Sequence, residues 1–162
     1  MIFVTLGSQK FQFNRLLLEI DNLVKKNILK PNEVFAQIGY STYEPKTYSF
    51  KKFLNKEEFL EYIEKSNIVV THGGTGSIIN SVKKGKKVIG VPRLAEFGEH
   101  VDNHQLEIIE QFTNSDLIYG VLDIKELGDS IGKVKDMVFR SYRSNSNNII
   151  NILEDFLDTS FK

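Results

Sequence analysis

Short apolar runs alternate along the chain with segments whose apolar residues recur every three or four positions. The runs predict strands, and the helical spacing predicts amphipathic helices. Strands that alternate with helices are typical of an α/β fold with a mostly parallel sheet. The pattern therefore predicts this class, as a single Rossmann-like domain. The expected strands are residues 2–6, 34–38, 47–53, 68–71, 87–91 and 117–119.

Helix signals fill the gaps between these runs. Asn55 precedes a helix whose third residue is Glu58, which is the pattern of a capping box. Gly85 is a typical stop for the short helix before it. A stripe of apolar residues from Ile124 to Val138 predicts a further helix after the last strand. The other expected helices are residues 14–26, 75–84, 103–112 and 149–157.

Length and charge exclude several classes of protein. The 162 residues predict one domain, and 21 basic against 21 acidic residues argue against a general nucleic-acid binder. The absence of cysteine removes disulfides, thiolate metal sites and cysteine nucleophiles. No apolar run approaches the ~20 residues that span a bilayer. The first residues read as a buried strand rather than a signal peptide. We therefore expect any membrane attachment to come from a surface patch or a partner.

The string His-Gly-Gly-Thr-Gly-Ser at 72–77 follows the fourth expected strand and opens a helix. In open α/β sheets, ligands bind beyond the carboxyl ends of the strands, and helix N-termini favour anions. Glycine allows close backbone approach, and Thr75 and Ser77 offer hydroxyl groups. The string therefore indicates a site for nucleotide phosphates, although a tight turn without a ligand is equally compatible. It is neither a P-loop nor a dinucleotide fingerprint.

A second polar string, Gly-Glu-His-Val-Asp-Asn-His-Gln at 98–105, follows the fifth expected strand. Its many donors and acceptors suit the hydroxyl groups of a sugar. His100 and His104 are four residues apart, but no third metal ligand is placed, so a metal site is disfavoured. The alternative is a solvated helix start.

Three other positions at strand ends carry weaker signals. Gly7-Ser8 follows the first strand and is expected at the same edge of the sheet. Phe53-Leu54 offers an apolar wall for a base ring, against the alternative of core packing. Arg93 suits either a phosphate contact or a surface salt bridge.

With these motifs in this order, the chain resembles the donor-binding half of GT-B glycosyltransferases. It resembles in particular the small soluble subunit of two-chain bacterial capsule and exopolysaccharide glycosyltransferases. It is also similar to the catalytic subunit of the eukaryotic two-chain N-acetylglucosaminyltransferase of dolichol-linked oligosaccharide assembly, and more distantly to the C-terminal half of MurG. The resemblance covers nearly the whole chain and is most specific at 71–77, 92–93 and 98–105.

The resemblance implies one UDP-sugar donor-binding domain over residues 1–162, equivalent to the C-terminal half of a GT-B enzyme. Asn80 stands where relatives often carry a glutamate that grips the ribose. The general base is left open between Glu99, His100 and a partner chain, which is favoured. The donor-binding residues implied are Gly7, Ser8, Phe53, Leu54, His72, Gly73, Gly74, Thr75, Gly76, Ser77, Asn80, Asn103, His104 and Gln105.

The resemblance further implies inverting transfer of a sugar from a UDP-sugar to a lipid-linked glycan in capsule or exopolysaccharide synthesis. Galactose is favoured, and N-acetylglucosamine and glucuronic acid are alternatives. No cofactor or metal ion is expected. A membrane-anchored acceptor-binding subunit is the expected partner, and it would hold the chain at the cytoplasmic face of the cell membrane.

Two rival functions remain open from the sequence. The first is a non-catalytic UDP-sugar-binding module or regulatory subunit, which the loss of the glutamate at Asn80 favours. The second is another Rossmann-type enzyme, such as a nucleotide-sugar epimerase or dehydrogenase. The missing fingerprint after the first strand argues against that second function.

Overall fold

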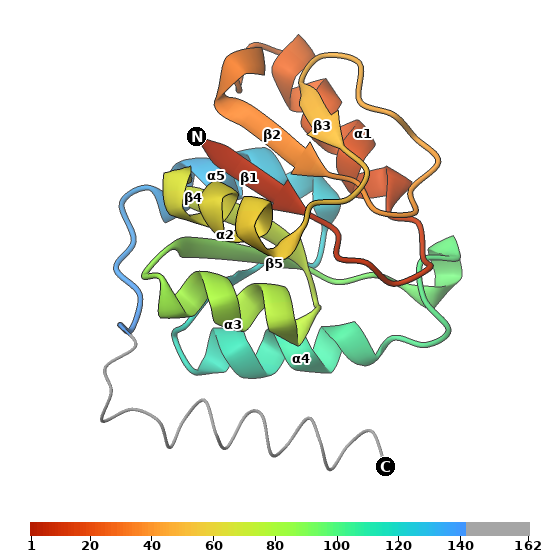
Figure 1. Cartoon of the computed structure of the whole chain (residues 1–162). Helices are drawn as coiled ribbons and strands as arrows, with labels where there is room; N and C mark the ends of the chain where they lie inside the picture. Colours follow the sequence, from red (N-terminus) through yellow and green to blue (C-terminus); the bar gives the residue numbers. More distant parts are fainter. Residues whose placement is uncertain (142–162) are drawn as a thin grey trace.

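The computed structural model describes residues 1–141, which form one six-stranded parallel sheet (Figure 1). The strand order is β3-β2-β1-β4-β5-β6, so the chain reverses direction across the sheet between β1 and β4. This confirms the predicted fold class. The strands are β1 Ile2–Thr5, β2 Val34–Gln37, β3 Ser49–Lys51, β4 Ile68–His72, β5 Lys87–Val91 and β6 Tyr119–Gly120.

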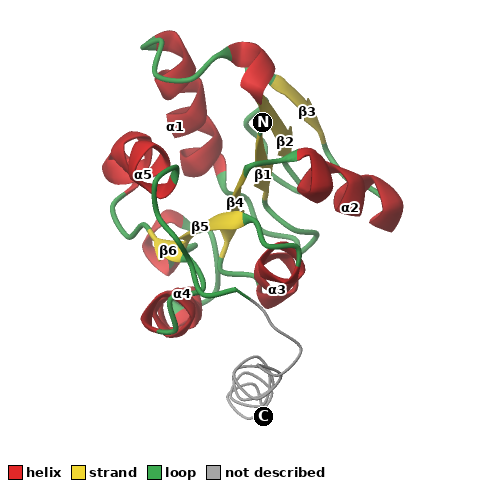
Figure 2. Cartoon of the chain, turned by 90° about the vertical axis from the view of Figure 1, so that its left-hand side faces the viewer, coloured by secondary structure: helices red, strands yellow, loops and turns green. Residues whose placement is uncertain are grey.

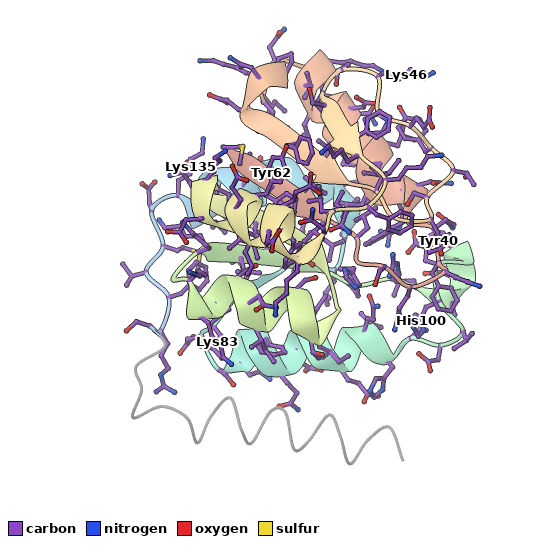
Figure 3. All side chains as sticks on the ribbon, in the orientation of Figure 1. Tyr40, Lys46, Tyr62, Lys83, His100 and Lys135 are labelled. Carbon is purple, nitrogen blue, oxygen red and sulfur yellow. The ribbon has the colours of Figure 1, made fainter. Side chains whose placement is uncertain are left out.

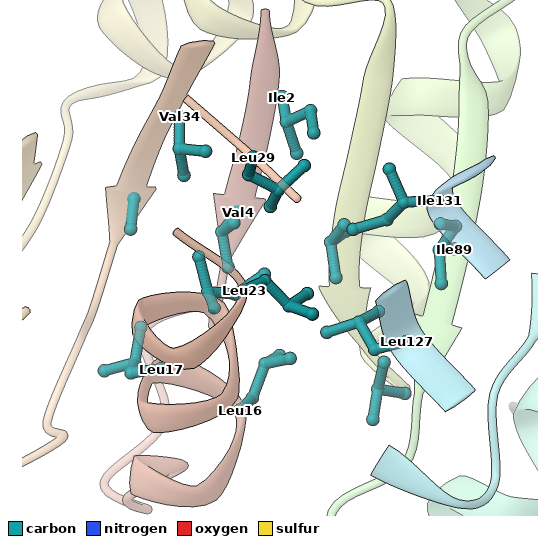
Figure 4. Packing of buried hydrophobic residues seen from close by; sticks show 14 of the residues in the cluster. Ile2, Val4, Leu16, Leu17, Leu23, Leu29, Val34, Ile89, Leu127 and Ile131 are labelled. Carbon is teal, nitrogen blue, oxygen red and sulfur yellow. The ribbon is translucent and has the colours of Figure 1, made fainter. Parts of the chain in front are cut away.

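Helices cover both faces of the sheet, with α1 and α5 on one face and α2, α3 and α4 on the other (Figure 2). Side chains of β1 alternate between the two layers: Ile2 and Val4 pack against α1 and α5 (Figure 4), and Phe3 packs against the opposite three helices. This alternation follows from the two-residue period of a strand. The helices are α1 Asn14–Lys25, α2 Lys56–Lys65, α3 Thr75–Lys83, α4 His104–Asn114 and α5 Leu127–Val134.

Local signals in the sequence are matched closely by the structure. The side chain of Asn55 accepts a hydrogen bond from the Glu58 backbone N–H, and the Glu58 side chain accepts one from the Asn55 N–H. This reciprocal capping box starts α2 as predicted. Gly85 has a φ of 67° at the end of α3, a conformation that glycine adopts without strain.

Several elements differ from their predicted extents: β6, for example, covers Tyr119–Gly120 instead of 117–119. Two of these differences are instructive. β3 pairs with β2 only over Ser49–Lys51, because the backbone N–H and hydroxyl of Thr47 donate to Asp21 instead of extending the strand. The last described helix ends at Val134, and Val138 is 95% exposed, so its predicted place on the buried stripe is wrong. The helix predicted over 149–157 lies outside the described residues. No helix within residues 1–141 has the length and apolar character needed to cross a membrane.

The sheet brings the carboxyl ends of β1, β4 and β5 to one edge. Thr5 pairs with Thr71, and His72 pairs with Val91, so the three strands end almost level. The loops that leave β1 and β5 both lie on the right-hand side of the molecule in Figure 1, where the strand arrows point. The polar strings predicted to form a site therefore start from neighbouring positions.

Candidate donor site

A cavity of about 280 Å³ opens at this edge, beside the first turn of α3. The glycine turn after β4, the exit of β1 and the start of α4 contribute its walls. Many of the predicted site residues are thus brought together. The cavity is lined by Gly7, Ser8, Gln9, His72, Gly73, Gly74, Thr75, Gly76, Ser77, His100, His104, Gln105 and Ile108.

The N-terminus of α3 is the electropositive part of this cavity. Gly74 is the N-cap residue, and no side chain caps this end of the helix. The first turn contains no acidic residue. Backbone N–H groups in the first turn of a helix have no partner within the helix, and the helix dipole adds partial positive charge there. The turn therefore offers several N–H donors to an anion.

Three glycines are required by close packing around the turn. A Cβ atom on Gly74 would lie 2.1 Å from His72 Nε2, and one on Gly73 would lie 2.7 Å from Gln105 Cβ. Gly7 has a φ of 70°, and a Cβ there would lie 2.7 Å from His72 Cε1. In contrast, a Cβ on Gly76 would meet no atom within 4 Å. Gly7 and Gly74 thus let the chain fold around the imidazole of His72, and Gly73 allows close contact with Gln105.

His72 is a buried, neutral histidine at the floor of the cavity. Burial lowers the pKa of His72 to about 3, the nearby charge of Arg93 adds to this effect, and a hydrogen bond with the Thr5 carbonyl opposes it. Nδ1 lies 3.4 Å from that carbonyl oxygen. A group with so low a pKa is a poor general base near neutral pH.

The side chain of Gln105 links the segments that follow β4 and β5. Its Oε1 accepts hydrogen bonds from the backbone N–H of Gly73 and from that of Arg93, each with an N–O distance of 3.0 Å. The side chain is 4% exposed. The predicted contact with a donor sugar is therefore limited to its amide N–H groups, because the oxygen already positions the glycine turn.

Glu99 does not line the cavity. Its carboxylate is buried in a two-point ion pair with Arg15, with Nε–Oε1 at 2.9 Å and Nη2–Oε2 at 3.0 Å. The backbone N–H of Leu94 also donates to Oε2. A carboxylate held in this way is unsuited to accept a proton from a substrate, so the structure favours a structural role for Glu99.

His100 does line the cavity, and it lies at the same edge in Figure 3. Its ring packs on Phe11 with a centroid distance of 4.7 Å, and Nδ1 lies 3.1 Å from Asp102 Oδ1. The pKa of Asp102 is lowered, chiefly because its carboxylate accepts a hydrogen bond from the His104 backbone N–H. Interactions with His100 and His104 add to this effect, and desolvation opposes it. This pairing leaves Nε2 of His100 as the ring nitrogen that can meet a substrate.

Comparison with known proteins assigns the family. Residues 1–159 match the model of the Glycosyltransferase family 28 C-terminal domain. The chain belongs to this family. The family 28 domain has the six-stranded sheet expected for the C-terminal half of a GT-B glycosyltransferase, which confirms that prediction.

Similar proteins are transferase subunits. The chain is 31% identical to the human UDP-N-acetylglucosamine transferase subunit ALG13 over 116 residues, which are 68% of this chain and 10% of the human protein. It is 32% identical to the subunit of the same name from Candida albicans over 94 residues, 57% of this chain and 29% of that protein. The chain therefore spans less than a third of either relative.

A solved structure shows the same fold. The crystal structure of the glycotransferase of kitacinnamycin superimposes with a TM-score of 0.60. The match covers 98% of this chain and 40% of that one, at 13% sequence identity.

Three predicted donor-binding positions of the family 28 domain lie near the cavity with different roles. His104 lines it and lies 3.5 Å through Nδ1 from Glu107 Oε2. Asn103 is exposed outside the lining, where its Oδ1 accepts a hydrogen bond from the Ala95 backbone N–H. Asn80 is also exposed outside the lining, and its Nδ2 donates to the Gly76 carbonyl at 2.8 Å. Only His104 of these three is placed at the cavity wall.

The predicted base-ring wall of the family 28 domain lies outside the cavity. Phe53 is 45% exposed and makes an edge contact with Tyr40, with ring centroids 5.1 Å apart. Leu54 packs partly buried against the core under α2, as the alternative interpretation expected. Tyr40 was missed by the sequence argument, although its position after Gly39 at the end of β2 marks the same edge. Figure 3 shows Tyr40 on the side of the molecule that carries His100.

Arg93 is in neither of its predicted environments, which were a phosphate contact and a surface salt bridge. Its side chain is fully buried, and Nη2 donates to the carbonyl oxygens of Leu6 at 2.8 Å and Phe11 at 3.2 Å. Burial lowers the pKa of Arg93 to about 10, while the charge of Glu99 acts to raise it, so the guanidinium stays charged at neutral pH. No local sequence pattern predicts that the carbonyl oxygens after β1 accept hydrogen bonds from this side chain.

A larger cavity, about 520 Å³, lies at the opposite edge of the sheet of the family 28 domain. Two lysines that line it donate hydrogen bonds to backbone carbonyl oxygens: Lys86 Nζ to that of Glu64 at 2.7 Å, and Lys87 Nζ to that of Lys135. Lys135 lies on the far side of the molecule from His100 in Figure 3. None of the predicted site residues lines this larger cavity.

Proposed function

We propose that the chain is the donor-binding, catalytic subunit of an inverting glycosyltransferase that uses a UDP-sugar. The uncapped N-terminus of α3 at the cavity carries this proposal. A nucleoside diphosphate gains negative charge as the sugar leaves, and preorganised N–H donors stabilise charge that develops in a transition state. Residues 74–77 of the turn supply such donors without a metal ion or cofactor.

The size of the cavity suggests how a UDP-sugar would lie. Small-molecule sites usually measure ~300–1,000 Å³, and this one is about 280 Å³. It suits the diphosphate and the sugar, next to His104 and the amide group of Gln105. The nucleoside would extend along the open edge toward the aromatic pair Tyr40 and Phe53. In this proposal Phe53 contacts the base ring from outside the cavity.

The proposed enzyme needs a second chain. The family 28 domain corresponds to one half of a GT-B enzyme, and the relatives from human and Candida albicans are named as subunits. We propose a membrane-anchored partner that binds a lipid-linked glycan at the cytoplasmic face, in capsule or exopolysaccharide synthesis. That partner is also the favoured source of the general base. Within this chain, His100 is the better placed alternative.

The donor sugar is a separate proposal. The names of the relatives make UDP-N-acetylglucosamine the first donor to test. UDP-galactose, which the resemblance to the bacterial subunits favours, and UDP-glucuronic acid belong in the same panel.

Calorimetric titration tests the proposal. UDP, the three UDP-sugars and NAD are titrated into the protein without metal, first alone and then with the partner chain. We expect micromolar-to-millimolar binding of UDP and none of NAD. Absence of UDP binding in both preparations would contradict the proposed function. Binding of NAD instead would favour the epimerase or dehydrogenase class.

A non-catalytic UDP-sugar-binding module is the second candidate. It is favoured by Asn80, whose amide binds the Gly76 carbonyl on the helix surface and lacks the charge of a carboxylate. Sugar transfer by the chain with its partner separates the two candidates. UDP-sugar binding without transfer would identify the module. An Asn80→Glu variant that binds UDP more tightly would indicate that the ribose is read at this position.

A further inference from the structure

Two arginines and one glutamate whose side chains are largely buried lie next to the loops around the donor cavity. Arg15 and Arg93 both come from strand or helix ends next to these loops, and Glu99 is the carboxylate whose charge acts on Arg93. Both oxygens of Glu99 are bound by Arg15. The ion pair is therefore neutral as a unit, and Arg93 remains as a charge without an ion-pair partner among residues 1–141.

Burying a charge without a partner is costly, and proteins usually avoid it. Arg93 has no exposed surface. Its Nη2 binds the carbonyl oxygens of Leu6 and Phe11, and its ring neighbour is Phe13, with Cζ 5.6 Å from the ring centroid. Within the described part of the chain, Nε and Nη1 make no hydrogen bond. These contacts orient the guanidinium but do not neutralise it.

The guanidinium lies directly behind the donor cavity. It contacts the carbonyl of Leu6, the residue before Gly7 in the cavity wall. The Arg93 backbone shares the Gln105 oxygen with the backbone of Gly73. The charge of Arg93 also acts on His72, which forms the cavity floor. The field of Arg93 thus reaches the wall that an anionic ligand would touch.

We propose that Arg93 is a positioning residue that attracts the diphosphate through its charge, from behind the cavity wall and without touching the ligand. This inference rests on the proposed donor function. A buried charge is screened less by salt and water than an exposed one. Arg93 would therefore supplement the dipole of α3 in a site that lacks an exposed basic side chain among its lining residues.

A series of ligands with different charge tests this role. Uridine, UMP and UDP are titrated into the wild type and into Arg93→Met and Arg93→Lys, with binding followed by NMR so that weak affinities are measured. Uridine is neutral, UMP carries about two negative charges and UDP about three at neutral pH. A Coulomb interaction at an effective dielectric constant of ~20 acts on each negative charge of the ligand and predicts that Arg93→Met raises the Kd of UDP at least about tenfold. The Kd of UMP rises less, that of uridine stays within about twofold, and lysine restores most of the affinity.

A purely structural role predicts a different result. Loss of the two carbonyl contacts would weaken all three ligands by the same factor, and lysine would restore little. Either observation would overturn the proposal. If Arg93→Met does not fold, Arg93→Gln takes its place beside the lysine variant. Wild-type protein that binds none of the three ligands, either alone or with the partner chain, would instead refute the proposed function, and this inference with it.

The Arg15–Glu99 ion pair provides the matched control. The double variant Arg15→Gln with Glu99→Gln removes one positive and one negative charge from the same loops. We expect the ratio of UDP to uridine affinity to stay within about twofold of the wild type. The NMR titration of His72 gives an independent readout, because Arg93→Met removes one cause of its low pKa and should raise it, whereas lysine should not.

Discussion

The turn after β4 and the loop after β5 contribute to the same cavity in opposite ways. The turn at 73–77 has few side chains, and its uncapped helix start leaves backbone N–H groups for a ligand. The loop at 98–105 is rich in polar side chains, but most of them bind their own chain. Glu99 forms an ion pair with Arg15, and Asn103 accepts a hydrogen bond from the Ala95 backbone. The side-chain oxygen of Gln105 accepts one from the backbone of the turn. The densely polar loop is thus mainly a scaffold, and the glycine turn is the proposed anion site.

The largest expected effect is on the stability of the scaffold. Glu99→Ala leaves Arg15 without its partner beside the already unpaired Arg93, and breaking such a buried pair typically costs about 3–5 kcal/mol. Urea unfolding measures this loss. Glu61→Ala removes the exposed partner of Lys65 and should change stability by less than about 1 kcal/mol. Equal effects of the two variants would contradict the structural role of Glu99.

The second effect is on binding at the turn. A Cβ on Gly74 would clash with His72 Nε2, so Gly74→Ala must displace the N–H groups that face the cavity. Loss of one or two charge-assisted hydrogen bonds, each worth about 1.5–3 kcal/mol, predicts a Kd for UDP that is at least about tenfold higher. Calorimetry measures it. Gly132→Ala, where a Cβ meets nothing within 4 Å, should leave the Kd unchanged. Unchanged UDP binding by Gly74→Ala would remove the turn from the site.

The third effect separates the scaffold role of Gln105 from its place in the cavity wall. Gln105→Glu keeps an oxygen for the backbone N–H groups of Gly73 and Arg93 but adds negative charge beside the diphosphate. We expect a measurable loss of stability, because the new carboxylate is buried without an ion-pair partner, and a Kd for UDP that rises at least about tenfold. Asn103→Asp adds the same charge outside the cavity and should cost less than about threefold. Equal losses by the two variants would place the ligand over the loop rather than at the turn.

The smallest effect is the pH dependence of stability. The pKa of His72 is lowered to about 3 in the folded state, below its unfolded value of ~6.5. Between these values the unfolded chain binds the extra proton, so this contribution is complete above pH 6.5 and is lost as pH falls. The expected loss is about 1 kcal/mol between pH 7 and 5.5. Urea unfolding across this range should give a shallower slope for His72→Gln than for the wild type. Parallel curves would contradict the burial of a neutral His72.

Features set by neighbouring residues were predictable from the sequence. The capping box of Asn55 and Glu58 and the strand Lys87–Val91 were placed correctly, because each depends on a short local pattern. Helical spacing up to Val138 was misleading, since spacing alone does not show where the sheet ends and burial stops. β3 was overextended because the bond between Thr47 and Asp21 joins residues far apart in the chain.

The location of the candidate site was predictable from the sequence, but the roles of several of its residues were not. The glycine turn and the exit of β1 were found because strand ends of a parallel sheet converge. The ion pair of Glu99 with Arg15 and the burial of Arg93 depend on contacts across more than 80 residues. No local pattern distinguishes a carboxylate that binds a substrate from one that binds a distant arginine.

The most direct test of the account is NMR mapping of UDP binding on the backbone amides of the wild-type chain. The account predicts that the largest shifts occur at Gly74 to Ser77, with smaller ones at Gly7 and His104. The amides beside Asn67 and Lys87 at the opposite edge of the sheet should not shift. Saturable shifts confined to that opposite edge, or to the loop around Val101, would contradict the claim that the glycine turn binds the diphosphate.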